Sequence, residues 1–306
     1  MSFRLDIHQR PSESVAATID AELEAAIASL EVTDPTARPD AVHDARKRLK
    51  KARSALRLVR GDLGNRTARR LNAELRDVAA SLSDRRDADV LAETVDELHE
   101  RFVGQVPAAT FDDLRDRLAR QVPAAAAGAD ADRIARLNAV REAVRDARFD
   151  RVTWTTVLAG IDRSYRRGRR AYRASPHAST GELHDWRKRA KDLWYHHRLL
   201  RDAHPTVVGA YAKDAHALAD LLGDDHDLAV LRATIVHHDP PAATAPVDLD
   251  PVVDLIDVRR ASLQAQARDV ARRLYAEKPK AFARRTRAYV RASARQRTPM
   301  STSTRS

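Results

Sequence analysis

The stretch AVHDARKRLKKARSALRLVR, residues 41–60, carries apolar side chains at alternating steps of three and four residues. The apolar positions are Val42, Ala45, Leu49, Ala52, Leu56 and Val59. This spacing predicts an amphipathic α-helix that buries one face in a helical bundle. The opposite face is basic and holds His43, Arg46, Lys47, Lys50, Ser54 and Arg57, with Lys51 and Arg53 at its edges.

A second stretch, LHDWRKRAKDLWYHHR at residues 183–198, repeats this design. Its apolar face holds Leu183, Trp186, Ala190, Leu193 and His197, and its other face holds His184, Arg187, Lys188, Lys191, Tyr195 and Arg198. A further pair, LSDRRDADVL (82–91) and LGDDHDLAVL (222–231), matches at the same offset of about 140 residues. Two matches in register predict an internal duplication about a pseudo-two-fold axis, which brings the two basic faces toward each other.

The composition favours an all-α fold. Hydrophobic residues make up 43% of the 306 and aromatic residues 5%, and strand-forming residues nowhere alternate convincingly. Breaks rich in Pro, Gly, Asp and Thr separate the expected helices. These helices are 12–31, 41–60, 66–82, 86–102, 110–121, 130–148, 151–174, 180–202, 205–222, 226–237, 251–276 and 279–295, followed by a tail at 296–306 that we expect to be disordered.

The charge balance indicates an acidic partner. Lys and Arg number 55 against 44 Asp and Glu, a net charge of +11, which attracts polyanions. The chain has no cysteine, which excludes disulfides, thiolate catalysis and Cys-ligated metals. The opening MSFRLDIHQR lacks the apolar core of a signal peptide, and no run of about 18 apolar residues occurs. We therefore expect a cytoplasmic protein that does not engage a membrane.

The first basic helix lacks internal neutralisation. Residues 46–60 contain eight Lys or Arg and no Asp or Glu. A charged helix face is normally solvated, but acids three or four residues away usually relieve its repulsion. The compensating charge must come from another helix or from a ligand, and two facing basic stripes favour a ligand. From His43 to Arg57 the stripe is about 21 Å long, which suits a chain of phosphates. Further arginines that could join it are Arg166, Arg169, Arg170 and Arg173.

Together these motifs resemble the CHAD domains, the conserved histidine α-helical domains. The resemblance covers about residues 5–295 and rests on both basic helices, both Leu-x-Asp-x-x-Asp-x-x-Val-Leu segments and YAEKPKAFARR at 275–285. It implies two pseudosymmetric helical bundles, a first repeat at about 5–148 and a second at about 151–295, around a basic central channel. It also implies binding of inorganic polyphosphate, and association with polyphosphate granules as a further expectation.

Carried over by position, the resemblance marks a histidine and the bases three and seven residues later. These are His43, Arg46 and Lys50 in the first repeat and His184, Arg187 and Lys191 in the second. The second motif departs from the family pattern at Asp192 and Trp194, where bases are usual, so the first helix is expected to carry more of the binding. A polyanion beside the motif histidines favours the imidazolium form.

Other chemistry finds less support. No two histidines are spaced three or four residues apart, so we expect no metal site, and no motif implies a cofactor. The carboxylates Asp84, Asp87, Asp224 and Asp227 are interpreted as helix caps at a break rather than as a magnesium site. A role for Asp87 and Asp227 in orienting a motif arginine stays open.

Two other functions remain as alternatives to polyphosphate binding. The Glu-x-Glu-x-Lys hallmark of the CYTH triphosphatases, to which many CHAD domains are fused, is absent: its nearest match, ELEAA at 22–26, lacks the lysine. We therefore expect no enzyme, although an accessory role to an enzyme of phosphate polymers is a weaker alternative. The runner-up is a helical protein that contacts the sugar-phosphate backbone of nucleic acid, but only Tyr195 and Trp194 lie near a basic stripe as stacking platforms. The sequence leaves the oligomeric state open.

Overall fold

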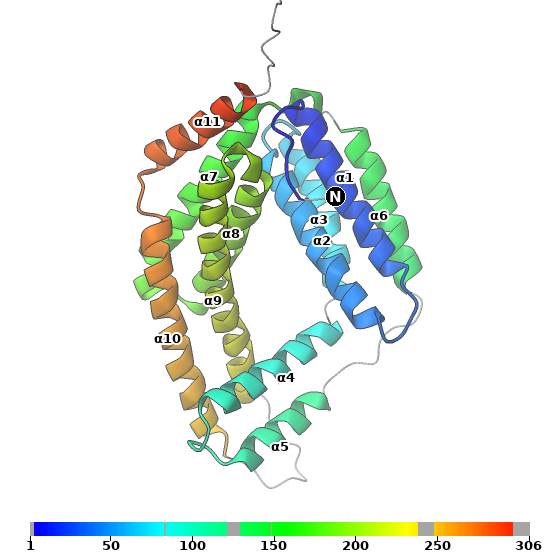
Figure 1. Cartoon of the computed structure of the whole chain (residues 1–306). Coiled ribbons are helices and arrows are strands. Elements are labelled where there is room, and N and C mark those ends of the chain that lie inside the picture. Colours follow the sequence, from blue (N-terminus) through cyan, green and yellow to red (C-terminus); the bar gives the residue numbers. More distant parts are fainter. Residues whose placement is uncertain (1–2, 83, 121–128, 148, 238–247, 296–306) are drawn as a thin grey trace, which may run out of the picture.

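The computed structural model describes residues 3–82, 84–120, 129–147, 149–237 and 248–295, apart from the side chains of 65, 84–89 and 129. Over these ranges the chain forms helices and no strand, which confirms the all-α fold class (Figure 1). The helices are α1 (Pro11–Leu30), α2 (Arg38–Leu58), α3 (Asn65–Ala80), α4 (Asp84–Arg101), α5 (Ala108–Ala119), α6 (Ala129–Arg145), α7 (Trp154–Ala174), α8 (Thr180–Leu199), α9 (Pro205–His237), α10 (Asp250–Leu274) and α11 (Pro279–Arg295). The predicted tail at 296–306 lies outside the described residues. Over the described helices, none is long and apolar enough to cross a membrane.

The expected break near residue 223 is wrong. Residues 205–222 and 226–237 were predicted as two helices, but α9 runs unbroken from Pro205 to His237. A glycine inside a helix costs only about 1 kcal/mol relative to alanine. Buried Leu222, Leu228 and Leu231 continue the apolar face through the glycine, so packing outweighs the local preference for a break.

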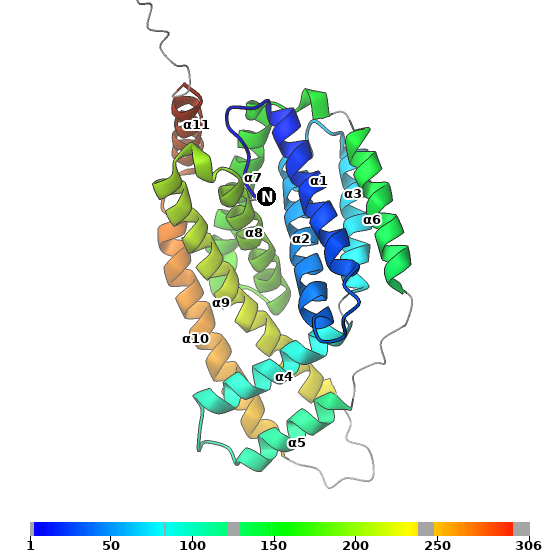
Figure 2. The same ribbon diagram turned by 45° about the vertical axis from the view of Figure 1, so that its right-hand side comes forward.

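The helices form two groups that meet along α2 and α8. In the first, α1 packs on α2 and α6, and α3 packs on α2 and α6. In the second, α8 packs on α7 and α9, and α9 packs on α10. The helices α4 and α5 lie apart from the first group and cross the lower end of the molecule, where α4 packs on α9 (Figures 1 and 2). The space between the two groups is thus bounded below by α4.

Two hydrophobic cores hold this arrangement together. The larger core is continuous from α1, α2, α3 and α6 into α7, α8, α9 and α11. The smaller core joins α4 and α5 to the lower parts of α9 and α10, through residues such as Val95, Phe111, Leu231 and Ile256. The smaller core is what anchors α4 opposite the basic ends of α2 and α8.

The buried side chain of His196 on α8 links this helix to α2 by a hydrogen bond. Nε2 of His196 donates to the carbonyl oxygen of Ser54 (3.1 Å), and its Nδ1 lies 3.0 Å from the hydroxyl of Ser164 on α7. Burial lowers the pKa of His196 to about 4, so the ring is neutral near pH 7. Beside it, a Cβ at Gly160 of α7 would overlap the Leu58 carbonyl oxygen at the end of α2. Three helices therefore meet here at close range.

Candidate functional site

The apolar faces predicted for the two motif helices are confirmed. On α2, Ala45, Leu49, Ala52 and Leu56 are buried, as is Val59 at its C-cap, and Val42 is partly buried against the same core. On α8, the buried residues include Leu183, Trp186, Ala190, Leu193 and His197. The opposite faces are shorter than expected, because Ser54 and Tyr195, both assigned to them, are buried as well. The helices cross at this level, so Ser54 and Tyr195 become interior, while Arg57 and Arg198 stay half-buried. Below the crossing, the N-terminal half of each basic face stays open.

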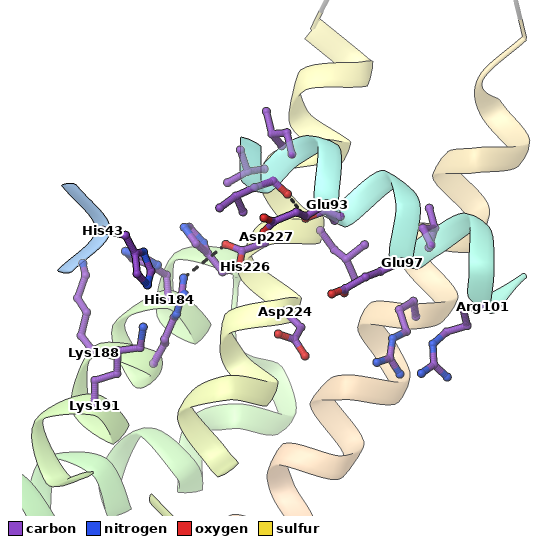
Figure 3. A pocket seen from close by; sticks show the side chains of 18 of the residues that line it. His43, Glu93, Glu97, Arg101, His184, Lys188, Lys191, Asp224, His226 and Asp227 are labelled. Carbon is purple, nitrogen blue, oxygen red and sulfur yellow. Dashed lines mark hydrogen bonds and ion pairs between the residues drawn. The ribbon is translucent and has the colours of Figure 1, made fainter. Parts of the chain in front are cut away.

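These two open halves line one cavity of about 1100 Å³. The motif helices contribute His43, Arg46, Lys50, His184, Arg187, Lys188 and Lys191. Figure 3 shows side chains of both helices, among them His43 and Lys191, directed into the same space. The histidine and the bases three and seven residues later thus come together from both motif helices.

The remaining predicted residues of α2 lie outside the cavity lining. Lys47 is exposed and pairs with Asp44 at 2.9 Å. Lys51 pairs with the buried carboxylate of Glu22 on α1 at 3.4 Å. Arg53 and Arg57 both donate to the amide oxygen of Asn72 on α3, each at 3.3 Å.

The predicted arginines of α7, and Arg198 of α8, also lie outside the cavity lining. Arg166 pairs with Asp162 one turn earlier, and Arg169 donates from Nε to the Tyr275 carbonyl oxygen (3.0 Å). Arg170 and Arg173 are exposed, the latter beside a separate hollow next to α10. The guanidinium of Arg198 lies over the rings of Phe3 and Trp194. The predicted basic residues therefore divide into a cavity group and a group elsewhere.

The charge that residues 46–60 lack is supplied in part by other helices. Glu22 pairs with Arg48 as well as Lys51. Asp192 of α8, which breaks the family pattern, accepts from Arg57 Nε at 3.0 Å and so joins α8 to α2. Carboxylates of other helices thus lie beside Arg48, Lys51 and Arg57 of α2, and Arg46 and Lys50 line the cavity.

The sequence motifs do not predict that residues of other helices form the opposite wall of the cavity. This wall is formed by α4, α9 and α10 and contributes Glu93, Glu97, Glu100, Arg101, Asp224, His226, Asp227 and Arg259. The assignment of Asp224 and Asp227 as caps is wrong, because both lie inside α9. Asp227 instead lies 3.6 Å from Arg187 Nη1, in line with the orienting role that stayed open. The side chains of Asp84 and Asp87 lie outside the described residues.

Burial and nearby like charges shift the pKa of Asp224 and Lys191 in the cavity. Burial raises the pKa of Asp224, and the nearby Glu97 and Asp227 raise it further. Burial lowers the pKa of Lys191 to about 8, and Arg187 is the next cause. Each shift reflects a charged group removed from water and placed next to like charge. An anionic ligand beside Lys191 would stabilise its charged form.

The histidine of the second motif is neutral near pH 7. Burial, followed by the nearby His226, lowers the pKa of His184 to about 4. The two rings lie 4.1 Å apart between centroids. Both Nδ1 atoms are buried, and neither has a hydrogen-bond partner within the part of the chain that the structure describes. The imidazolium expected at His184 is therefore not the form of the unliganded protein.

The described side chains include no group of three or more His, Asp or Glu arranged to hold a metal ion. Among curated proteins, no relative matches this chain. The family model of the CHAD domain matches residues 19–236, which include both motif helices and most of the cavity wall. This chain therefore belongs to the CHAD domain family.

Proposed function

We propose that this chain binds inorganic polyphosphate in the cavity between α2 and α8 without catalysing a reaction. The observation that carries the proposal is that five Arg and Lys side chains and both motif histidines, from two helices far apart in the sequence, line one cavity. Polyphosphate carries negative charge on every unit, and charged hydrogen bonds to Arg and Lys are the contacts best suited to phosphate oxygens. The CHAD family assignment agrees with a polyphosphate-related function.

The spread of the basic residues favours a chain over a single ion. From His43 to Lys50 the open face of α2 is about 10 Å long, and the face of α8 from His184 to Lys191 has the same length. One phosphate group is too small to contact both ends of either face. A linear polymer can meet successive bases on one helix and then on the other.

The matched positions support the finer architecture that we propose. His43, Arg46 and Lys50 follow one another on α2 at the same steps as His184, Arg187 and Lys191 on α8, and all line the cavity. We infer an internal duplication whose halves share this cavity as a central channel. A cytoplasmic protein that associates with polyphosphate granules is the corresponding cellular proposal.

Nucleic acid is the competitor against which this function is tested. The described cavity lining contains no Phe, Tyr or Trp on which a base could stack. Tyr195 is buried and the ring of Trp194 lies under Arg198. The two aromatic residues near the basic faces are therefore occupied within the fold, which supports phosphate alone as the recognised group.

The test compares two triple variants with equal loss of charge. Changing Arg46, Lys50 and Lys191 to alanine removes cavity bases, whereas changing Lys47, Arg166 and Arg170 removes exposed ones. At about 1.5–3 kcal/mol for each charged hydrogen bond, the cavity variant should bind labelled long-chain polyphosphate at least a thousandfold more weakly. The surface variant should change affinity less than tenfold.

Competition at physiological salt completes this test. Unlabelled polyphosphate should displace the labelled chain at lower phosphate concentration than single-stranded or duplex nucleic acid. Equal losses in the two triple variants would contradict the cavity as the binding site. Stronger competition by nucleic acid would replace the proposed ligand.

A further inference from the structure

The cavity is not uniformly positive. Its α4 and α9 wall places Glu93, Glu97, Asp224 and Asp227 across from the basic ends of α2 and α8 (Figure 3). These carboxylates oppose any anion that enters. The position of each one relative to the motif arginines therefore decides how much of the attraction remains.

Arg187 is a motif base that this wall contacts at short range. Its guanidinium lies against Gly223 of α9, where an added Cβ would lie 3.2 Å from Nη2 and 3.5 Å from Nε. One turn further along α9, Asp227 Oδ1 lies 3.6 Å from Nη1. The glycine thus lets the guanidinium settle on the helix with its charge next to a carboxylate.

This contact is an ion pair rather than a hydrogen bond, because 3.6 Å exceeds hydrogen-bond length. The Nε–H of Arg187 is buried and has no acceptor within the described residues. The Arg187 side chain as a whole is 20% exposed and lines the cavity, so a ligand can reach the exposed part of its guanidinium. A phosphate placed on it would come within about 6 Å of Asp227, where repulsion between unit charges weakens binding by between tenfold and a hundredfold.

We propose that Asp227 is an internal counter-anion of Arg187, whose attraction a ligand must overcome, so that the cavity retains only anions that bring several phosphate groups at once. This inference rests on the proposed function. It names Asp227 as the residue that sets how many phosphate groups a ligand needs in order to be retained. A single phosphate gains one charged contact and meets the full repulsion of Asp227. A chain gains further contacts with Arg46, Lys50 and Lys191, which offset it.

The test is Asp227→Asn, which removes the charge and keeps the shape. Calorimetric titration at fixed ionic strength measures binding of orthophosphate, which brings a single phosphate group, and of long-chain polyphosphate. The variant should bind both at least tenfold more tightly than the unaltered chain, with the larger gain for orthophosphate, which has no further contacts to offset the repulsion. Asp257→Asn is the matched control, because Asp257 pairs with Arg232 on the outer side of α9 and lies outside the cavity lining. The control should change affinity less than twofold.

The same substitution in an Arg187→Ala background tests whether Asp227 acts through Arg187 or only repels any anion in the cavity. In Arg187→Ala, the further change Asp227→Asn should give less than a third of its effect in the unaltered chain. An equal gain in both backgrounds would refute the counter-anion role. Unchanged or weaker binding in Asp227→Asn would also refute it and assign Asp227 to positioning Arg187. Failure of the unaltered chain to bind polyphosphate would instead overturn the proposed function.

Discussion

Replacing Asp192 with alanine should lower the free energy of unfolding by about 2–4 kcal/mol. Asp192 is only 8% exposed and accepts from Arg57 across the contact between α2 and α8. Its other oxygen lies 3.9 Å from Arg189. Removing one partner of a buried pair costs about 3–5 kcal/mol, because the other charge stays behind without compensation. The Arg57 side chain is 31% exposed and can regain water, which sets the lower estimate.

The matched control is Asp185→Ala on the same helix. Asp185 pairs with Lys188 at 3.0 Å, but both side chains are more than half exposed. An exposed pair contributes about 0–1 kcal/mol, so this variant should lose little stability. Both variants remove one negative charge from α8, and their difference therefore isolates the effect of burial.

Urea unfolding monitored by circular dichroism at pH 7 gives the two free energies. A cycle with Arg57→Ala should show a coupling of at least 1 kcal/mol between Arg57 and Asp192. If Asp192→Ala loses no more stability than Asp185→Ala, the contact does not join the two helix groups. The departure of Asp192 from the family pattern would then have no structural explanation.

Three further predictions follow from the packing and the histidines. Gly160→Ala should destabilise the fold by about 2 kcal/mol or more, because the new methyl group overlaps the backbone at the end of α2. Gly209→Ala, with open space around the new methyl group, should instead stabilise the fold by about 0.5–1 kcal/mol. Thermal unfolding of both variants measures these changes, and a Gly160→Ala variant as stable as the unaltered chain would refute the close contact. Burial lowers the pKa of His196 and His197 from 6.5 to about 4, so between these pH values the unfolded state binds more protons than the folded state. The free energy of unfolding should therefore fall by about 3 kcal/mol per histidine as the pH drops from 6.5 to 4. Urea titrations across this range that show no loss of stability would contradict neutral buried rings. The pKa of His184 is likewise about 4 in the unliganded cavity, so polyphosphate binding near pH 5.5 should take up protons, measured by calorimetry in buffers of different ionisation enthalpy, and His184→Gln should reduce the uptake.

Much of the fold could be predicted from local patterns. The steps of three and four that place Ala45, Leu49 and Ala52 on one face of α2 also bury them, because helix geometry alone decides which side chains share a face. The same geometry places the bases three and seven residues after each motif histidine on the open side. All four of these bases line the cavity.

The predictions that failed concern contacts between helices. The glycine and aspartates near residue 223 are typical of a break, yet α9 continues because its apolar face is covered on both sides of the glycine. Ser54 and Tyr195 are polar positions on the helical wheel, but the crossing of α2 and α8 buries them. No pattern within one helix reveals where another helix crosses it.

By itself the sequence determined the helical class, the two basic faces and the repeated motif, since these depend on side-chain spacing along a single helix. Only the tertiary structure decided which cations share a cavity and which carboxylates of other helices lie beside them. Glu22 and Asp192 reach the upper part of α2 from other helices, and α9 brings Asp227 to Arg187. Electrostatic energy depends on distances between charges in space, and those distances are set by how the helices pack.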